Sequence, residues 1–112
     1  MNVEMIVRQI EVIEMEYPDG YTLDLEVMEL VTKGYPVGFK ETQGSFGTDG
    51  LRICVKHALE NDRHLGMWVN GEGIRQYDSI RIFTDLTAAL EFARANDQEA
   101  IWDLTEMKEI RC

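Results

Sequence analysis

The residues best suited to chemistry in this 112-residue chain lie in a glycine-rich loop and in a set of aromatic side chains. The loop, TQGSFGTDG at residues 42–50, precedes a predicted helix, and the unpaired backbone N–H groups of a helix N-terminus attract phosphate. Gln43, Ser45 and Thr48 are its candidate ligand-binding residues. The loop lacks the Gly-Lys-Ser/Thr ending of a Walker loop. The alternative is a plain flexible loop in which Thr48 or Asp49 caps the helix.

Aromatic side chains follow in the second half of the chain, and such rings commonly stack on nucleotide bases. They are Trp68, Tyr77, Phe83, Phe92 and Trp102. A core position explains the two phenylalanines better, because each falls where a strand or helix must bury something. Tryptophan and tyrosine have a polar atom that a core position has to satisfy, so the ligand interpretation stays open for them.

Polar side chains near these aromatics could pair with a phosphate or with a base edge. They are Arg75, Arg81, Asn96 and Arg111. A solvated strand face also explains each arginine, and a left-handed helix stop also explains Asn96. The full set of candidate ligand-binding residues is Trp68, Tyr77, Phe83, Asn96, Trp102, Arg111, Gln43, Ser45 and Thr48.

Catalytic and metal chemistry have little support in the sequence. A metal site at His57, Glu60, Asp62 and His64 would need the helix to continue through Asn61 and Asp62, and no further ligands stand at a known spacing. Ser45 lacks the elbow sequence of a hydrolase. We therefore expect no catalytic residue, no metal and no cofactor.

The net charge of −10 argues against nonspecific binding of nucleic acid, which requires Lys and Arg to displace counterions from phosphates. The charge is uneven, because residues 1–31 contain eight acids against the single Arg8, while residues 32–84 are slightly basic. An anionic ligand should prefer the middle of the chain, and a basic partner its beginning.

Cysteine content and the N-terminal segment indicate a cytoplasmic protein. Cys54 falls on the apolar face of a predicted helix and Cys112 is the last residue, so the two do not form a disulfide framework. The first sixteen residues contain acids throughout and resemble neither a signal peptide nor a membrane span.

Hydrophobic periodicity and turn residues predict a single α+β domain over residues 1–112, with a mostly antiparallel sheet and two helices packed on it, in the order ββ(β)αββαβ. The expected strands are 3–17, 21–27, 35–42, 66–70, 76–84 and 100–104, with 109–112 able to pair back on the last one. A hairpin turn is expected at Tyr17-Pro18-Asp19-Gly20. The helices are expected at 51–60 and at 86–95, the second capped by Asp85.

Several segments of the chain carry a resemblance to known proteins. Those in the second half are the Trp68 strand, Tyr77-Asp78-Ser79, Phe83 with Asp85, Ala89 to Ala93, Asn96, Gln98, Ala100 to Leu104 and Glu109-Ile110. Those in the first half are Pro18-Asp19-Gly20, Lys33-Gly34-Tyr35 and Glu41 to Gly47. In these segments the chain resembles a family of small proteins encoded by bacteriophages and other mobile elements. Most members of that group have no assigned activity.

The chain is also similar to phage anti-defence proteins that sequester cyclic ADP-ribose-type signals of the Thoeris immune system. This resemblance implies a homo-oligomeric, non-enzymatic sponge whose pocket lies at a subunit interface and uses an aromatic stack, an asparagine and arginines. Trp68, Phe83, Asn96 and Arg111 are the positions that could match. The alternative is an acidic inhibitor that blocks a basic surface of a host defence enzyme, as an anti-restriction or anti-CRISPR protein does. We expect no nucleic-acid partner and no membrane.

Overall fold

The computed structural model describes residues 2–112 and confirms an α+β fold with a mostly antiparallel sheet and helices packed on it. Its elements are α1 (Val3–Glu16), β1 (Gly20–Asp24), β2 (Glu29–Leu30), β3 (Tyr35–Gly38), the 3₁₀ turn η1 (Lys40–Thr42), β4 (Ser45–Phe46), α2 (Gly47–Leu59), β5 (His64–Val69), β6 (Arg75–Phe83), α3 (Leu86–Ala95), β7 (Ala100–Asp103) and β8 (Lys108–Arg111).

The prediction of a strand over residues 3–17 is wrong, because this segment forms α1. The Asn2 side chain caps the helix by accepting a hydrogen bond of 2.9 Å from the Met5 N–H. The buried positions, Ile6, Val7, Ile10 and Glu14, recur at helical spacing. The expected hairpin turn at residues 17–20 is therefore the connection from α1 to β1.

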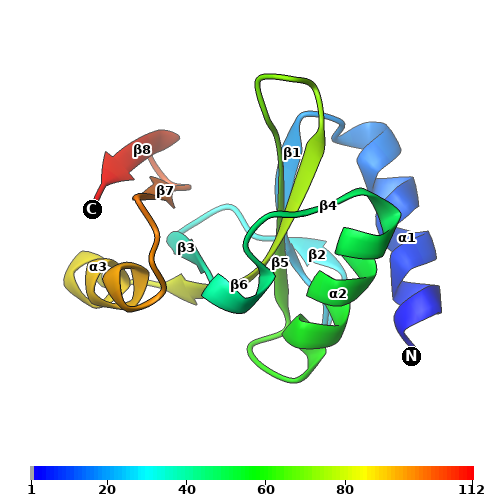
Figure 1. The fold of residues 1–112 in the computed structure, drawn as a ribbon, viewed down its shortest axis with the longest axis horizontal. Helices are drawn as coiled ribbons and strands as arrows, with labels where there is room; N and C mark the ends of the chain where they lie inside the picture. Colours follow the sequence, from blue (N-terminus) through cyan, green and yellow to red (C-terminus); the bar gives the residue numbers. More distant parts are fainter. Residues whose placement is uncertain (1) are drawn as a thin grey trace.

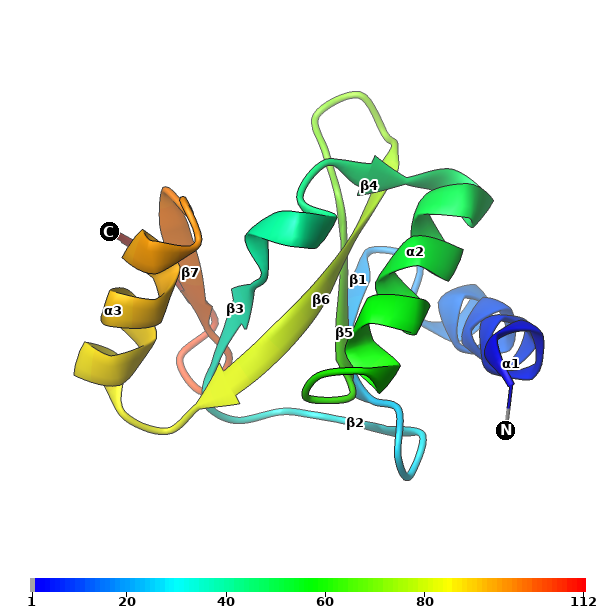
Figure 2. The same ribbon diagram turned by 60° about the horizontal axis from the view of Figure 1, so that its bottom comes forward.

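One sheet forms the centre of the molecule, in the order β2-β1-β5-β6-β3, with the short β4 also paired to β6 (Figures 1 and 2). All of its pairings are antiparallel. β5 pairs with β1 along one edge and with β6 along the other, so it joins the N-terminal strands of the sheet to the later ones.

Helices α1 and α2 cover one face of this sheet. Their apolar residues form one core cluster with Tyr21, Leu23, Leu65, Met67 and Tyr77 of the sheet. α2 begins at Gly47, earlier than predicted, and Phe46 is its N-cap without a side-chain hydrogen bond. The predicted caps at Thr48 and Asp49 are wrong, because both residues already lie inside the helix.

The segment that joins β2 to β3, residues 31–34, crosses the sheet from one edge to the other on the side away from the helices (Figure 2). It ends at Gly34, whose φ of +96° favours glycine. A Cβ at Gly34 would stand 2.9 Å from the Phe83 carbonyl oxygen and 3.0 Å from the Ile82 side chain. The crossing segment therefore meets the sheet at the C-terminal end of β6.

A second core cluster holds α3 and the β7–β8 hairpin beside β3 (Figure 1). Asp85 caps α3 as predicted, since its carboxylate accepts a hydrogen bond of 2.9 Å from the Ala88 N–H. The predicted return strand at the C-terminus is confirmed as β8. The left-handed residue after α3 is Asp97, at φ 57°, and not Asn96, at φ −107°.

None of the helices within residues 2–112 is both long enough and apolar enough to cross a bilayer.

Candidate functional site

The sheet face opposite α1 and α2 carries the best candidate site. On β5, Leu65 and Met67 belong to the helix-covered core. Successive strand residues point to opposite faces, so Gly66 and Trp68 point away from the helices. Trp68 is 51% exposed, which is unusual for a tryptophan on a central strand.

Phe46 stands on the same face as Trp68, on the other side of β6. Gln76 pairs directly with Trp68 across one edge of β6 and with Phe46 across the other edge. Directly opposed residues of an antiparallel pair point to the same side, so Phe46, Gln76 and Trp68 form one line across three strands, which we call the aromatic row. Phe46 is 61% exposed. The aromatic row lies at the end of β6 that the crossing segment leaves uncovered (Figure 2).

Asp78 is the ionisable residue beside the aromatic row. It lies two residues from Gln76 on the same face of β6 and pairs with Gly66. A Cβ placed on Gly38 would be 3.4 Å from the Asp78 Cγ, so the carboxyl group lies over a glycine there as well. Burial raises the pKa of Asp78 to about 7, and a hydrogen bond from the Trp68 side chain partly offsets this rise.

Tyr77 points the other way and serves the fold. It is 4% exposed, and its hydroxyl donates a hydrogen bond of 2.6 Å to Oε2 of the buried Glu14. The Tyr21 hydroxyl donates a second one, of 2.8 Å, to the same oxygen. Burial, together with Glu14, raises the pKa of both tyrosines. This buried network fastens α1 to the sheet.

Phe83 and Asn96 also take structural positions. Phe83 packs against Phe92, with ring centroids 5.2 Å apart, in the second core cluster. Asn96 is buried, its Oδ1 accepts from the Lys40 N–H at 3.1 Å, and its Nδ2 donates to the Phe92 carbonyl at 3.0 Å. These contacts explain both residues without a ligand, and their ligand role stays a prediction.

The three loop residues do not converge on one point. Gln43 and Thr48 are exposed, at the end of η1 and inside α2 respectively. Ser45 pairs with the inward-facing Tyr77 and therefore points to the helix side of the sheet. Ser45 lies there near the buried Cys54, whose pKa rises to about 11 mainly through burial.

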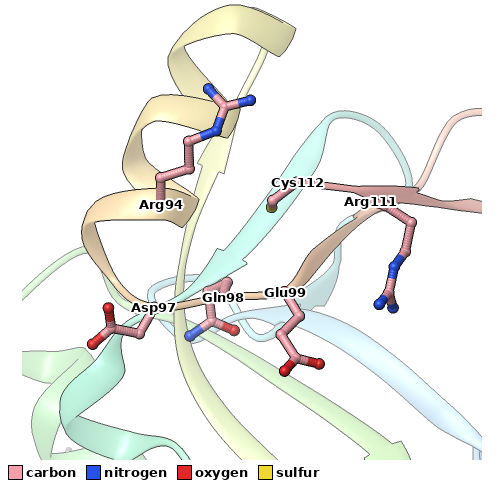
Figure 3. Close-up of a pocket in the computed structure, with 6 residues that line it drawn as sticks. All are labelled: Arg94, Asp97, Gln98, Glu99, Arg111 and Cys112. Atoms are coloured by element: carbon pink, nitrogen blue, oxygen red, sulfur yellow. The ribbon is translucent and has the colours of Figure 1, made fainter.

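Trp102 and Arg111 lie together, but on the β7–β8 hairpin, away from Trp68 (Figure 1). Arg111 also lines an open depression of about 700 Å³ (Figure 3), with Arg94, Asp97, Gln98, Glu99 and Cys112 as the other lining residues. Two arginines and two acids balance each other there, so the depression has no preference for an anion.

One further arrangement, which sequence patterns did not indicate, brings a serine, an imidazole and a carboxylate together. His57 Nδ1 lies 2.8 Å from Ser79 Oγ, and His57 Nε2 lies 3.9 Å from Glu41 Oε2. Ser79 is completely buried, so no substrate reaches its hydroxyl in this conformation. The arrangement packs α2 and η1 against β6.

The four residues considered for a metal do not assemble into a site. His64 Nε2 lies 3.7 Å from Asp24 Oδ2, and His57 faces Ser79. Asp62 pairs with the Arg81 guanidinium, which lies over the rings of Phe39 and Phe92. Within residues 2–112 no three His, Cys, Asp or Glu side chains are grouped as metal ligands.

No family model matches the chain, and comparisons with curated proteins and with solved structures give no match either. The geometry of the aromatic row and Asp78 is therefore the basis for inferring function.

Proposed function

We propose that this protein binds and sequesters a nucleotide-derived immune signal, of the cyclic ADP-ribose or cyclic oligonucleotide type, without catalysis, as a phage anti-defence protein. The observation that carries the proposal is the pair of exposed rings, Phe46 and Trp68, on either side of Gln76. Base stacking on an aromatic side chain contributes about 1 to 3 kcal/mol per base. Of the candidate ligand-binding residues predicted from the sequence, the proposal uses Trp68.

The spacing of the aromatic row suits a planar ligand. Neighbouring strands are about 4.8 Å apart, so the backbones of Phe46 and Trp68, with β6 between them, are separated by about 10 Å. A ring sandwiched between two others needs about 7 to 8 Å between the outer rings. Side chains that lean inward from the two strands would reach this separation, and Gln76, between them on β6, would then offer its amide group to the ligand.

Charge indicates which part of the ligand the site holds. The aromatic row and its neighbours Gly66 and Asp78 include no lysine or arginine, and the whole chain has a net charge of −10. Phosphates would therefore remain in solvent, and binding would depend on the base. The affinity of such a site changes little with salt, in contrast to binding through phosphates.

A base bound on an open sheet face would stay largely in contact with water. A second copy of the chain would cover its exposed side and close the site. We therefore include a homo-oligomer in the proposal. The molar mass in solution, with and without ligand, measures this part separately.

The test measures binding of cyclic ADP-ribose, cyclic dinucleotides and cyclic trinucleotides by thermal shift and calorimetry. The wild type is compared with three variants. Trp68→Ala and Phe46→Ala should each weaken binding about 5- to 150-fold, the equivalent of 1 to 3 kcal/mol. Trp102→Ala is the matched control, because Trp102 is 39% exposed on a different hairpin. The ligand should be recovered unchanged after heating. Equal binding by the Trp68 and Trp102 variants, or conversion of the ligand, would contradict the proposal.

A second candidate function is the acidic inhibitor of a host defence enzyme, and the outer face of α1 favours it. Met5, Val12 and Met15 are 50%, 66% and 82% exposed there. Their spacing of seven and three residues places them on one stripe, flanked by Glu11 and Glu16. An apolar stripe between acids is complementary to a basic protein surface that has apolar side chains at its centre.

A further inference from the structure

We propose that two copies of this chain pair through the outer edge of β8, each adding the same strand of the other antiparallel to its own. β8 belongs to the two-stranded β7–β8 sheet and, within residues 2–112, pairs with β7 alone. It lies at the periphery of the molecule (Figure 1). A two-stranded sheet is marginally stable, and added strands stabilise it. This contact is different from a second copy over the aromatic row and does not depend on nucleotide binding.

The backbone groups along the outer edge of β8 belong to Glu109 and Arg111. The Cys112 N–H donates to the Glu99 carbonyl across the hairpin, at 3.0 Å. Hydrogen-bonding direction alternates along a strand, so Ile110 also turns its N–H and C=O toward β7, whereas Glu109 and Arg111 turn theirs outward. In the part of the chain that the structure describes, no strand pairs with this edge. An antiparallel partner strand would therefore meet two N–H donors and two C=O acceptors.

Side-chain charge selects the register of such a pairing. In a symmetric pair centred on Ile110, Glu109 of each copy lies opposite Arg111 of the other, and the outward backbone groups of these residues meet as hydrogen-bonded pairs. Opposite charges directly across two strands stabilise the pairing. A pair centred on Glu109 or on Arg111 would instead oppose two like charges. A shift by one residue would place the inward-pointing backbone groups of Ile110 opposite outward-pointing ones, and their hydrogen bonds could not form.

The side chains of β8 suit a contact between identical chains. Glu109 and Arg111 are 57% and 71% exposed, and Oε1 of the first lies 3.6 Å from a guanidinium nitrogen of the second. A second copy would complete a square of alternating charges on this face of the hairpin. Ile110 points to the other face, where it packs, partly buried, against the second core cluster. The net charge of −10 opposes contact between copies in general, but β8 holds Lys108 and Arg111 against the single acid Glu109.

The experiment measures the molar mass of the full chain by sedimentation equilibrium from about 10 μM to about 1 mM, a range that covers small, weak interfaces. The wild type should dimerise. Glu109→Arg and Arg111→Glu each place like charges opposite in the symmetric pair, so each variant alone should dimerise at least about tenfold more weakly. A mixture of the two variants sets two acids against two cations in the same register, and it should form a heterodimer at least as tight as the wild-type dimer.

Lys108→Glu is the matched control, because Lys108 is an exposed charge of the same strand that lies opposite Cys112 in the proposed register. This variant should dimerise within about threefold of the wild type, since an exposed charge without a close partner contributes little. A wild type that stays monomeric at about 1 mM, a dimer that persists in both single variants, or a mixture that stays monomeric would overturn the proposal. A dimer lost in Trp68→Ala but kept in the Glu109 and Arg111 variants would overturn it as well, because the contact would then be the aromatic row. No nucleotide is present in these measurements, so the proposed function is tested separately.

Discussion

Replacing Asp78 by asparagine should remove a pH-dependent loss of stability. Below about pH 3 this carboxyl group is protonated in both the folded and the unfolded chain. Between its usual value of 3.8 and its folded pKa of about 7, the folded chain holds a proton that the unfolded chain has released, so rising pH destabilises the fold. Above pH 7 the penalty is complete. About three pKa units at 1.36 kcal/mol each give an upper limit of about 4 kcal/mol.

Asp78 is partly exposed, so we expect about 2 to 4 kcal/mol. The assay is urea unfolding of the wild type and of Asp78→Asn from pH 4 to pH 8. Taking the difference between the two proteins at each pH cancels the titration of all other groups. The variant should gain on the wild type as pH rises, with most of the gain between pH 4.5 and pH 7. A difference that stays constant over this range would show that Asp78 ionises normally.

Two further predictions concern α1. Tyr77→Phe removes one of the two hydrogen bonds to the buried Glu14 carboxylate and should cost about 1.5 to 3 kcal/mol in urea unfolding, while Tyr17→Phe, at an exposed position, should cost less than about 0.5 kcal/mol. Equal losses of stability in the two variants would show that the hydrogen bonds to Glu14 do not stabilise the fold. Val12→Lys and Met15→Lys should leave stability within about 0.5 kcal/mol, because both side chains are exposed. If the second candidate function holds, these variants lose the wild type's low-salt capture of a basic host protein; unchanged capture would exclude the outer face of α1.

The order of the longer strands and of the two later helices from residue 20 onward could be predicted from the sequence, because there turn residues and periodicity agree. The short strands β2 and β4 were not predicted, and the strand expected over residues 35–42 ends at Gly38. α1 could not be predicted, since its apolar residues occupy two faces. Ile6 and Ile10 are buried, while Met5, Val12 and Met15 are exposed, and the mixture obscures the helical period. The N-cap at Asn2 was the one local indication of a helix.

The candidate site was predictable only in part. Trp68 was among the candidate ligand-binding residues, and its side chain is 51% exposed, while its ligand role stays a prediction. Phe46 was missed because its partner Gln76 lies thirty residues away, and pairing register between distant strands is not visible in one sequence. Asp78 was missed because its burial depends on which face of the sheet the helices leave uncovered. Tyr77 was a ligand candidate because no partner for its hydroxyl group was visible in the sequence. That partner is the Glu14 carboxylate, which lies on α1, the segment wrongly predicted as a strand.

The central position of β5 has a consequence for synthesis of the chain. β1 pairs with β5 along its whole length, but it leaves the ribosome long before β5 does. The surface on which α1 packs is likewise incomplete until β5 and β6 have been made. The β5–β6 hairpin, in contrast, forms from neighbouring residues, and local contacts form fastest. We expect this hairpin to assemble first and then to capture β1 and α1, so the N-terminal half stays unfolded, with its apolar residues accessible to chaperones, until most of the chain has been made.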